Sequence, residues 1–284
     1  MTSTLETHDA GTRPATTPRP AATGGGVRGV LAGEWVKLRS LRSTWLTLGL
    51  ALVAMVLLGW LFAGTAESGG PGDGGPGGDG PGFGATDPAT LSLAGYTLAS
   101  LAIGTVGVLL VTGEYANGLI RTTFAAVPRR WPVVAGKAAV FAALVFVASA
   151  VAALLAFLVG QAAYGDGAAS LSDDGVPRML VGTALYLSAI GLLGMALGWL
   201  VKSTAGAVSA LFGLLFLLPV LGQLLPSSWG PDVTRWLPGD AGSQVLQLTT
   251  SADAFGPWAG FAVLCGYLVV AFGAAVALLR RQDA

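Results

Sequence analysis

Charge is scarce in this sequence, and its scarcity excludes most soluble protein classes. Only 11% of the 284 residues are charged, whereas 53% are hydrophobic. Soluble domains usually carry about 25% charged residues. The formal net charge is zero and no long basic run occurs, so the chain also lacks the electrostatic pattern of a nucleic-acid-binding protein. The composition predicts a polytopic membrane protein.

Cysteine and histidine each occur once, which excludes sites built from several of them. Cys265 lies in an apolar run, so neither a disulfide framework nor a metal cluster is expected. His8 lies in a Thr/Pro/Ala-rich segment and is expected to be solvated. We therefore predict no metal site.

A phosphate-binding loop is also missing. The pattern G-x-x-x-x-G-K-[S/T] holds nucleotide phosphates with backbone amides and a lysine. The one Gly-Lys pair is Gly136-Lys137, but Ala138 follows it and Trp131 stands where the first glycine is needed. We expect that this chain hydrolyses no ATP itself, is not an enzyme and binds no cofactor.

Six segments reach the length of about 20 mostly apolar residues that a membrane-spanning helix needs. They are Thr44–Ala63, Thr90–Thr112, Ala138–Ala163, Met179–Val201, Ala205–Leu225 and Gly256–Leu279. None of these segments contains an ionisable residue other than Tyr and Cys. Proton-coupled carriers keep ionisable groups on their pathway, and a serine hydrolase needs a base beside its nucleophile. The spans therefore argue against both classes.

Two segments precede the first span. Residues 1–26 lack apolar periodicity and have no signal-peptide core, which predicts a disordered cytoplasmic tail. Residues 27–43 predict an amphipathic interfacial helix, with a charged flank as the alternative. Its apolar positions recur every three or four residues and are Val27, Leu31, Trp35, Leu38 and Leu41. Trp35 suits the headgroup level, and basic residues such as Lys37 and Arg42 suit anionic lipid.

Lysine and arginine predict the topology. If the N-terminus is cytoplasmic, every basic residue except Arg178 and Arg235 falls on the inner side. Six spans then place both termini in the cytoplasm. Residues 64–89 become a Gly/Pro-rich external loop, which we expect to be a flexible linker.

Small residues predict where helices pack. Gly191, Gly194 and Gly198 lie close to one face of the fourth span, and the last two form a GxxxG pair that permits close backbone approach. Packing within the chain and a seam between two copies both remain open. Pro219 predicts a kink in the fifth span.

The inner loop 113–137 contains the least ordinary pattern. Glu114 and Tyr115 extend the second span, and Gly118 ends or bends it. The stretch that follows predicts a short surface helix that exposes Leu119, Ile120 and Phe124, and such exposure favours a partner. The alternative is a solvated loop whose arginines only mark topology.

Three stretches together resemble type-2 ABC transporter permeases of actinobacteria. They are "GEWVKLRSLRSTW", "GEYANGLIRTTFAAVPRR" with "AGKA", and "WLPGDAG", and the resemblance extends over residues 27–281. It implies an all-α integral membrane protein whose six spans, residues 44–281, form one half of a homo- or heterodimer. It also implies separate ABC ATPase subunits that bind ATP and Mg. The Gly/Pro-rich loop departs from the family pattern.

The resemblance further assigns roles to single segments. It implies an elbow helix over residues 27–43, an acidic inner extension at Glu114 and a coupling helix over Leu119–Val127, with Gly118 and Arg121 matching the family pattern. Arg121 would pair with acidic residues of the ATPase. Short helices between the fifth and sixth spans would cover the outer mouth.

The expected function is that of the permease subunit of an ATP-driven exporter in the plasma membrane. Its substrate is unidentified, and the apolar spans suit a hydrophobic one. The alternatives are a non-transporting six-span interaction or immunity protein and, third, a membrane enzyme, which the uncharged spans disfavour.

Overall fold

The structure is a computed structural model that describes residues 27–40, 42–68, 87–120, 131–165, 167–226, 229–249 and 254–281. The predicted tail over residues 1–26 and most of the Gly/Pro-rich loop lie outside the described residues. So do Arg121 and Phe124 of the predicted coupling helix.

All regular elements of the described ranges are helices, and six helical segments are long and apolar enough to cross a membrane. The spans are α2 (Arg42–Ser68), α4 (Tyr96–Ala116), α6 (Trp131–Tyr164), α7 (Val176–Val201), the continuous α8 (Thr204–Phe212), η1 (Gly213–Leu217) and α9 (Leu218–Gln223), and α12 (Pro257–Arg281). A separate helix, α1 (Val27–Ser40), precedes them. These elements confirm the predicted all-α integral membrane fold with six spans.

The core forms around α7, which packs against α4, α6, α8 and α12. Glycines bring the backbones of α4 and α7 together. A Cβ atom on Gly194 would overlap the carbonyl oxygen of Gly104, and one on Gly107 would overlap that of Gly191. Gly198 faces the carbonyl oxygen of Val108 at 3.1 Å from the position of its missing Cβ. The structure thus places the three glycines of α7 at a contact within the chain.

The second predicted span is wrong at its start, because the helix is interrupted between Ser92 and Tyr96. A short helix, α3 (Pro88–Ser92), is capped by Asp87, whose side chain accepts a hydrogen bond from Thr90 N at 2.9 Å. Gly95 then lies against the backbone of Met55 on α2, where a Cβ would collide. This close contact turns the chain before α4 begins.

Two other spans also differ from their predicted form. Helix α6 begins at Trp131, seven residues before Ala138, so that Lys137 lies in the helix instead of the loop. In the fifth span, a π-helical turn over Gly213–Leu217 directly precedes α9, whose second residue is Pro219. Proline lacks a backbone N–H, and a π turn is one way in which a helix accommodates the disrupted hydrogen bonding.

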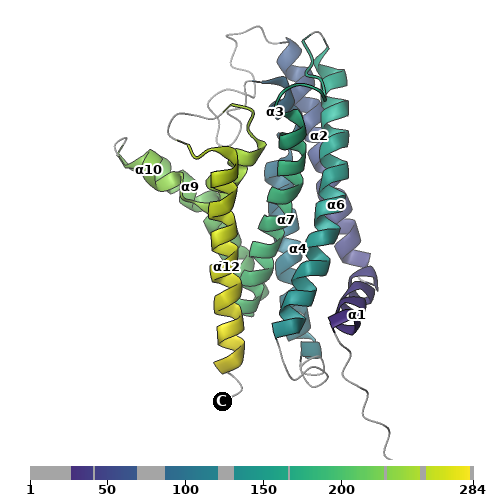
Figure 1. Ribbon diagram of the computed structural model, residues 1–284, viewed down its shortest axis with the longest axis vertical. Coiled ribbons are helices and arrows are strands. Elements are labelled where there is room, and N and C mark those ends of the chain that lie inside the picture. Colours follow the sequence, from purple (N-terminus) through teal and green to yellow (C-terminus); the bar gives the residue numbers. More distant parts are fainter. Residues whose placement is uncertain are drawn as a thin grey trace, which may run out of the picture.

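The ends of the bundle differ in what they contain (Figure 1). One end, called here the α1 end, holds α1, the connection that leaves α4, the turn from α7 to α8 and the last residues of α12. The opposite end holds α3 and the connection between α6 and α7. The described part of the connection between the fifth and sixth spans contains three short helices, namely α10 (Gly230–Thr234), α11 (Pro238–Ser243) and η2 (Gln244–Leu246).

Candidate functional site

Helix α1 turns both an apolar and a charged side chain toward the bundle. Leu38 and Glu34 are each 3% exposed, whereas Trp35 is 46% exposed, and its placement at the lipid headgroups stays a prediction. Burying a carboxylate requires a charged or hydrogen-bonding partner. That partner lies on α6, against which α1 packs, and the need to pair it turns Glu34 inward.

The partner of Glu34 is Lys137, and the two belong to a closed ring of four charges. Lys137 Nζ lies 2.6 Å from Glu34 Oε2 and 2.8 Å from Glu114 Oε1. Lys37 Nζ lies 2.9 Å from Glu34 Oε1 and 3.2 Å from Glu114 Oε1. Each lysine therefore contacts both glutamates. This charged ring joins α1, the end of α4 and the start of α6.

The ring is neutral as a whole and is shielded unevenly. The side chains of Glu34 and Lys137 are 4% exposed and that of Glu114 is 11% exposed, whereas Lys37 is 40% exposed. Lys37 thus points to the surface of the α1 end while its ammonium group pairs with both carboxylates. The predicted contact of Lys37 with anionic lipid stays a prediction.

Electrostatics keep the two α1 members of the ring ionised. Burial alone would raise the pKa of Glu34, but the charge and hydrogen bond of Lys137, with a smaller contribution from Lys37, lower that pKa below its usual value. Burial would lower the pKa of Lys37, yet its hydrogen bond to Glu34 and the charge of Glu114 raise that pKa overall. Both groups are charged at neutral pH.

The end of α4 positions Glu114. The helix continues to Ala116, and Asn117 N donates to Gly113 O at 3.1 Å. Gly118 then adopts a left-handed conformation with φ of +69°, which ends helices readily because glycine has no Cβ. The chain leaves the helix one turn after Glu114, so this side chain stays at the helix end beside α1.

A second set of contacts joins the same end of α4 to α7 and α8. The ring of Tyr115 packs edge-on against buried Trp199 of α7, with 5.9 Å between ring centroids. The ammonium group of Lys202, in the turn between α7 and α8, lies 5.8 Å from the centroid of the Tyr115 ring. Thr204 Oγ1 donates to Thr112 Oγ1 at 2.8 Å. Residues 112–115 thereby contact four other elements.

The predicted docking residues do not form one exposed surface. Leu119 is 53% exposed, as expected, but Ile120 is only 7% exposed and belongs to the hydrophobic core. The prediction of an exposed Ile120 is wrong, because the residues after Gly118 turn one apolar side chain into the bundle and the other outward. Arg42 is exposed at the start of α2.

A small cavity of about 200 Å³ lies beside the charged ring. Its lining includes all four ring members, Asn117 and Leu119. Within the described part of the chain, Glu114 Oε2 is buried and accepts no hydrogen bond. The cavity thus lies between α1 and the segment that leaves α4, with the charged ring set in a mainly apolar lining.

Sequence reasoning missed two members of the ring. Glu34 falls on the charged face of the predicted elbow helix, and Lys137 ends the predicted inner loop, so both read as solvated residues. The two residues are 103 positions apart, so no local sequence pattern links them. Pairing over such a distance depends on the tertiary packing of α1 on α6.

The arrangement of this site is suited to holding helices in a fixed relative position. Its four charges neutralise one another, and the described residues contain no group of three or more His, Cys, Asp or Glu side chains that could hold a metal ion. Ionic contacts of this type fix the relative position of helices, and their loss leaves buried charges without partners. The arrangement is suited to hold α1, α4 and α6 together at the point where the connection from α4 to α6 leaves the bundle.

Comparison with known proteins identifies the family. No curated protein matches this chain. The sequence profile described as ABC-2 family transporter protein matches residues 87–284, which include the α4 and α6 members of the charged ring. This match covers more than half of the chain, and it agrees with the six spans. The chain therefore belongs to the ABC-2 family of transporter proteins, as a membrane-spanning permease subunit of an ABC transporter.

Proposed function

We propose that this chain is the permease half of an ATP-driven exporter and that its α1 end receives motion from a separate ATPase subunit. In this proposal the ATPase binds ATP and Mg, and the chain itself binds neither. The connection between α4 and α6 docks on the ATPase. A second permease half, identical or related, completes the transport pathway.

One observation carries the proposal: three residues at the end of α4, Thr112, Glu114 and Tyr115, together contact α1, α6, α7 and α8. The contacts are the charged ring, the Tyr115 ring with Trp199, and the Thr112 hydroxyl. A displacement of the connection just beyond Gly118 therefore acts on several spans at once. Packed helices respond to such a displacement by moving as rigid bodies.

The distribution of basic residues supports a cytoplasmic position for the α1 end. Basic side chains gather there, and they are Lys37, Arg39, Arg42, Lys137, Lys202, Arg280 and Arg281. Arg178 lies in the first turn of α7, at the opposite end. Cytoplasmic loops carry an excess of Lys and Arg, so we place both termini in the cytoplasm and the chain in the plasma membrane.

The proposal also includes outward transport and a hydrophobic substrate. The outward direction follows from the resemblance to exporter-type permeases. The uncharged, apolar spans favour a lipid-like or drug-like molecule over an ion, because no ionisable side chain is available along most of their length.

The first experiment is to purify the tagged chain from its native membranes in mild detergent and to identify the proteins that remain bound. We expect a P-loop ATPase with the wild-type chain. Leu119→Asp and Arg121→Glu should release it, because they place charge into the docking segment. Leu171→Asp is the matched control, since Leu171 is a similarly exposed leucine, 42% exposed, at the opposite end of the bundle.

Two outcomes would contradict the proposal. A folded chain that recovers no ATPase would favour the non-transporting interaction protein. Equal release by Leu119→Asp and Leu171→Asp would place the ATPase elsewhere than at the connection between α4 and α6.

A further inference from the structure

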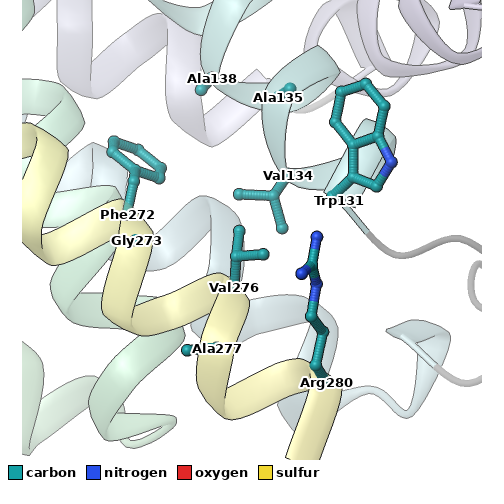
Figure 2. A pocket seen from close by; sticks show the side chains of 9 residues that line it. All are labelled: Trp131, Val134, Ala135, Ala138, Phe272, Gly273, Val276, Ala277 and Arg280. Carbon is teal, nitrogen blue, oxygen red and sulfur yellow. The ribbon is translucent and has the colours of Figure 1, made fainter.

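A long groove lies between α6 and α12 at the α1 end (Figure 2). Both helices pack on α7, which leaves a space of about 690 Å³ between them. Its lining residues from α6 are Trp131, Val134, Ala135 and Ala138, and those from α12 are Phe272, Gly273, Val276, Ala277 and Arg280. The volume falls within the ~300–1,000 Å³ that is typical of ligand pockets.

The walls of the groove are apolar and are kept wide by small residues. Ala135 and Ala138 face it from α6, and Gly273 and Ala277 face it from α12. A Cβ atom built on Gly273 would meet no atom within 4 Å, so this position borders open space. Because α6 and α12 are both membrane-spanning helices, the groove is open to hydrocarbon chains of the bilayer and suits one of them.

One end of the groove carries a positive charge. Arg280 lies in the last turn of α12, and its side chain extends toward Trp131 at the first residue of α6 (Figure 2). Among the residues that the structure describes, no acidic side chain lines the groove and none forms an ion pair with Arg280. A guanidinium at the edge of an apolar groove favours a planar or tetrahedral oxyanion, which it binds with two parallel hydrogen bonds.

The position of this charge identifies the source of the anion. Arg280 and Trp131 lie at the ends of their spans, where tryptophan and basic residues meet lipid headgroups. Basic pockets between membrane-spanning helices are known to bind anionic headgroups. We propose that the groove binds one anionic phospholipid, with an acyl chain along its apolar walls and the phosphate at Arg280. The proposal does not depend on the docking of an ATPase.

The test compares binding of two lipids that differ only in headgroup charge. The full-length chain in detergent is titrated with phosphatidylglycerol or phosphatidylcholine of the same acyl composition, and native mass spectrometry counts the bound lipids. We expect one phosphatidylglycerol to bind more tightly than the others and more tightly than phosphatidylcholine. Arg280→Gln should weaken that binding about fivefold, and Arg280→Lys should weaken it less.

Each variant has a matched control. Arg281→Gln removes the neighbouring charge, which does not line the groove. Gly273→Leu fills the groove and should weaken binding of both lipids, whereas Gly266→Leu adds the same side chain at another open position of α12 outside it. A melting curve for each variant verifies that it is folded.

Four results would overturn the proposal. If Arg280→Gln and Arg281→Gln weakened phosphatidylglycerol binding equally, the lipid would be attracted to positive charge in general and not to a site at Arg280. Unchanged lipid binding by Gly273→Leu would show that the acyl chain does not occupy the groove. Equal affinity of the wild-type chain for both lipids would exclude an anionic headgroup site, as would a groove filled by a second copy of the chain.

Discussion

Lys137 is the residue that holds the charged ring together. It contacts two glutamates that lie on different helices, and its side chain is 4% exposed. Lys37 also contacts both carboxylates, but it is far more exposed and is one turn away from Glu34 on the same helix. The buried lysine is therefore the main ionic link between α1 and the spans.

Replacing Lys137 with methionine should destabilise the protein by about 3 kcal/mol, because it leaves the carboxylates of Glu34 and Glu114 buried with one partner instead of two. The free energy of unfolding in detergent measures this cost. Arg39→Met, at an exposed position of α1, is the control and should change stability by less than about 0.5 kcal/mol. Adding Glu34→Gln to Lys137→Met should cost less than the two separate losses combined. An effect of Lys137→Met no larger than that of Arg39→Met would refute the role of the ring.

The partly buried carboxyl group of Asp240 on α11 should make the stability of the folded chain depend on pH. Burial raises its pKa to about 6, whereas an unfolded aspartate titrates near 3.9. Between these values the folded chain binds more protons than the unfolded chain, so stability falls as the pH rises. The side chains of Tyr96 and Tyr186 interact electrostatically with it.

The wild-type chain should therefore lose about 1 kcal/mol of stability between pH 5 and pH 7 relative to Asp240→Asn. Thermal unfolding in detergent at both pH values measures the difference. Glu34 acts in the opposite direction, since its lowered pKa adds stability that is lost as the pH falls, and the comparison with Asp240→Asn cancels this contribution. Parallel pH profiles for the two proteins would exclude the effect.

At the scale of elements, the contact between α4 and α7 depends on missing side chains. Backbone atoms of the two helices approach so closely that the Cβ of an alanine at position 194 would overlap the carbonyl oxygen of Gly104. In a membrane, where lipid is as apolar as the helices, such close packing contributes much of the helix association.

Gly194→Ala should cost about 1–3 kcal/mol, because the two helices must separate to admit the methyl group. Gly113→Ala is the matched control in α4, since a Cβ there meets no atom within 4 Å. Both changes raise helix propensity equally, and the control should be neutral or stabilising. Unfolding curves of the two variants decide the matter, and equal stability would show that the contact adapts at no cost.

At the scale of the whole molecule, docking and transmission are separable in the proposed transporter. Leu119 lies on the exposed connection, whereas Glu114 is part of the internal ring. We expect Glu114→Gln to retain the ATPase during purification but to lower the stimulation of ATP hydrolysis by the permease severalfold. Leu119→Asp should lose the ATPase itself. Paired measurements of bound ATPase and of ATP hydrolysis in reconstituted vesicles test this, and an unchanged rate with Glu114→Gln would remove the ring from the transmission path.

The sequence alone determined the number and the approximate positions of the spans. Long uncharged apolar runs have few alternatives to a membrane-spanning helix, because each backbone polar group must be satisfied within its own segment. The turn at Gly118 that follows the end of α4 was equally predictable, since glycine adopts a left-handed conformation at little cost.

Only the tertiary structure decided the charged ring, the orientation of α1 and the burial of Ile120. Each depends on which surfaces meet after the helices pack, and a local pattern of apolar residues does not predict those contacts. Glu34 and Lys137 read as solvated charges until α1 lies on α6, where burial makes their pairing obligatory. The groove between α6 and α12 is likewise a space left by the packing of both helices on α7.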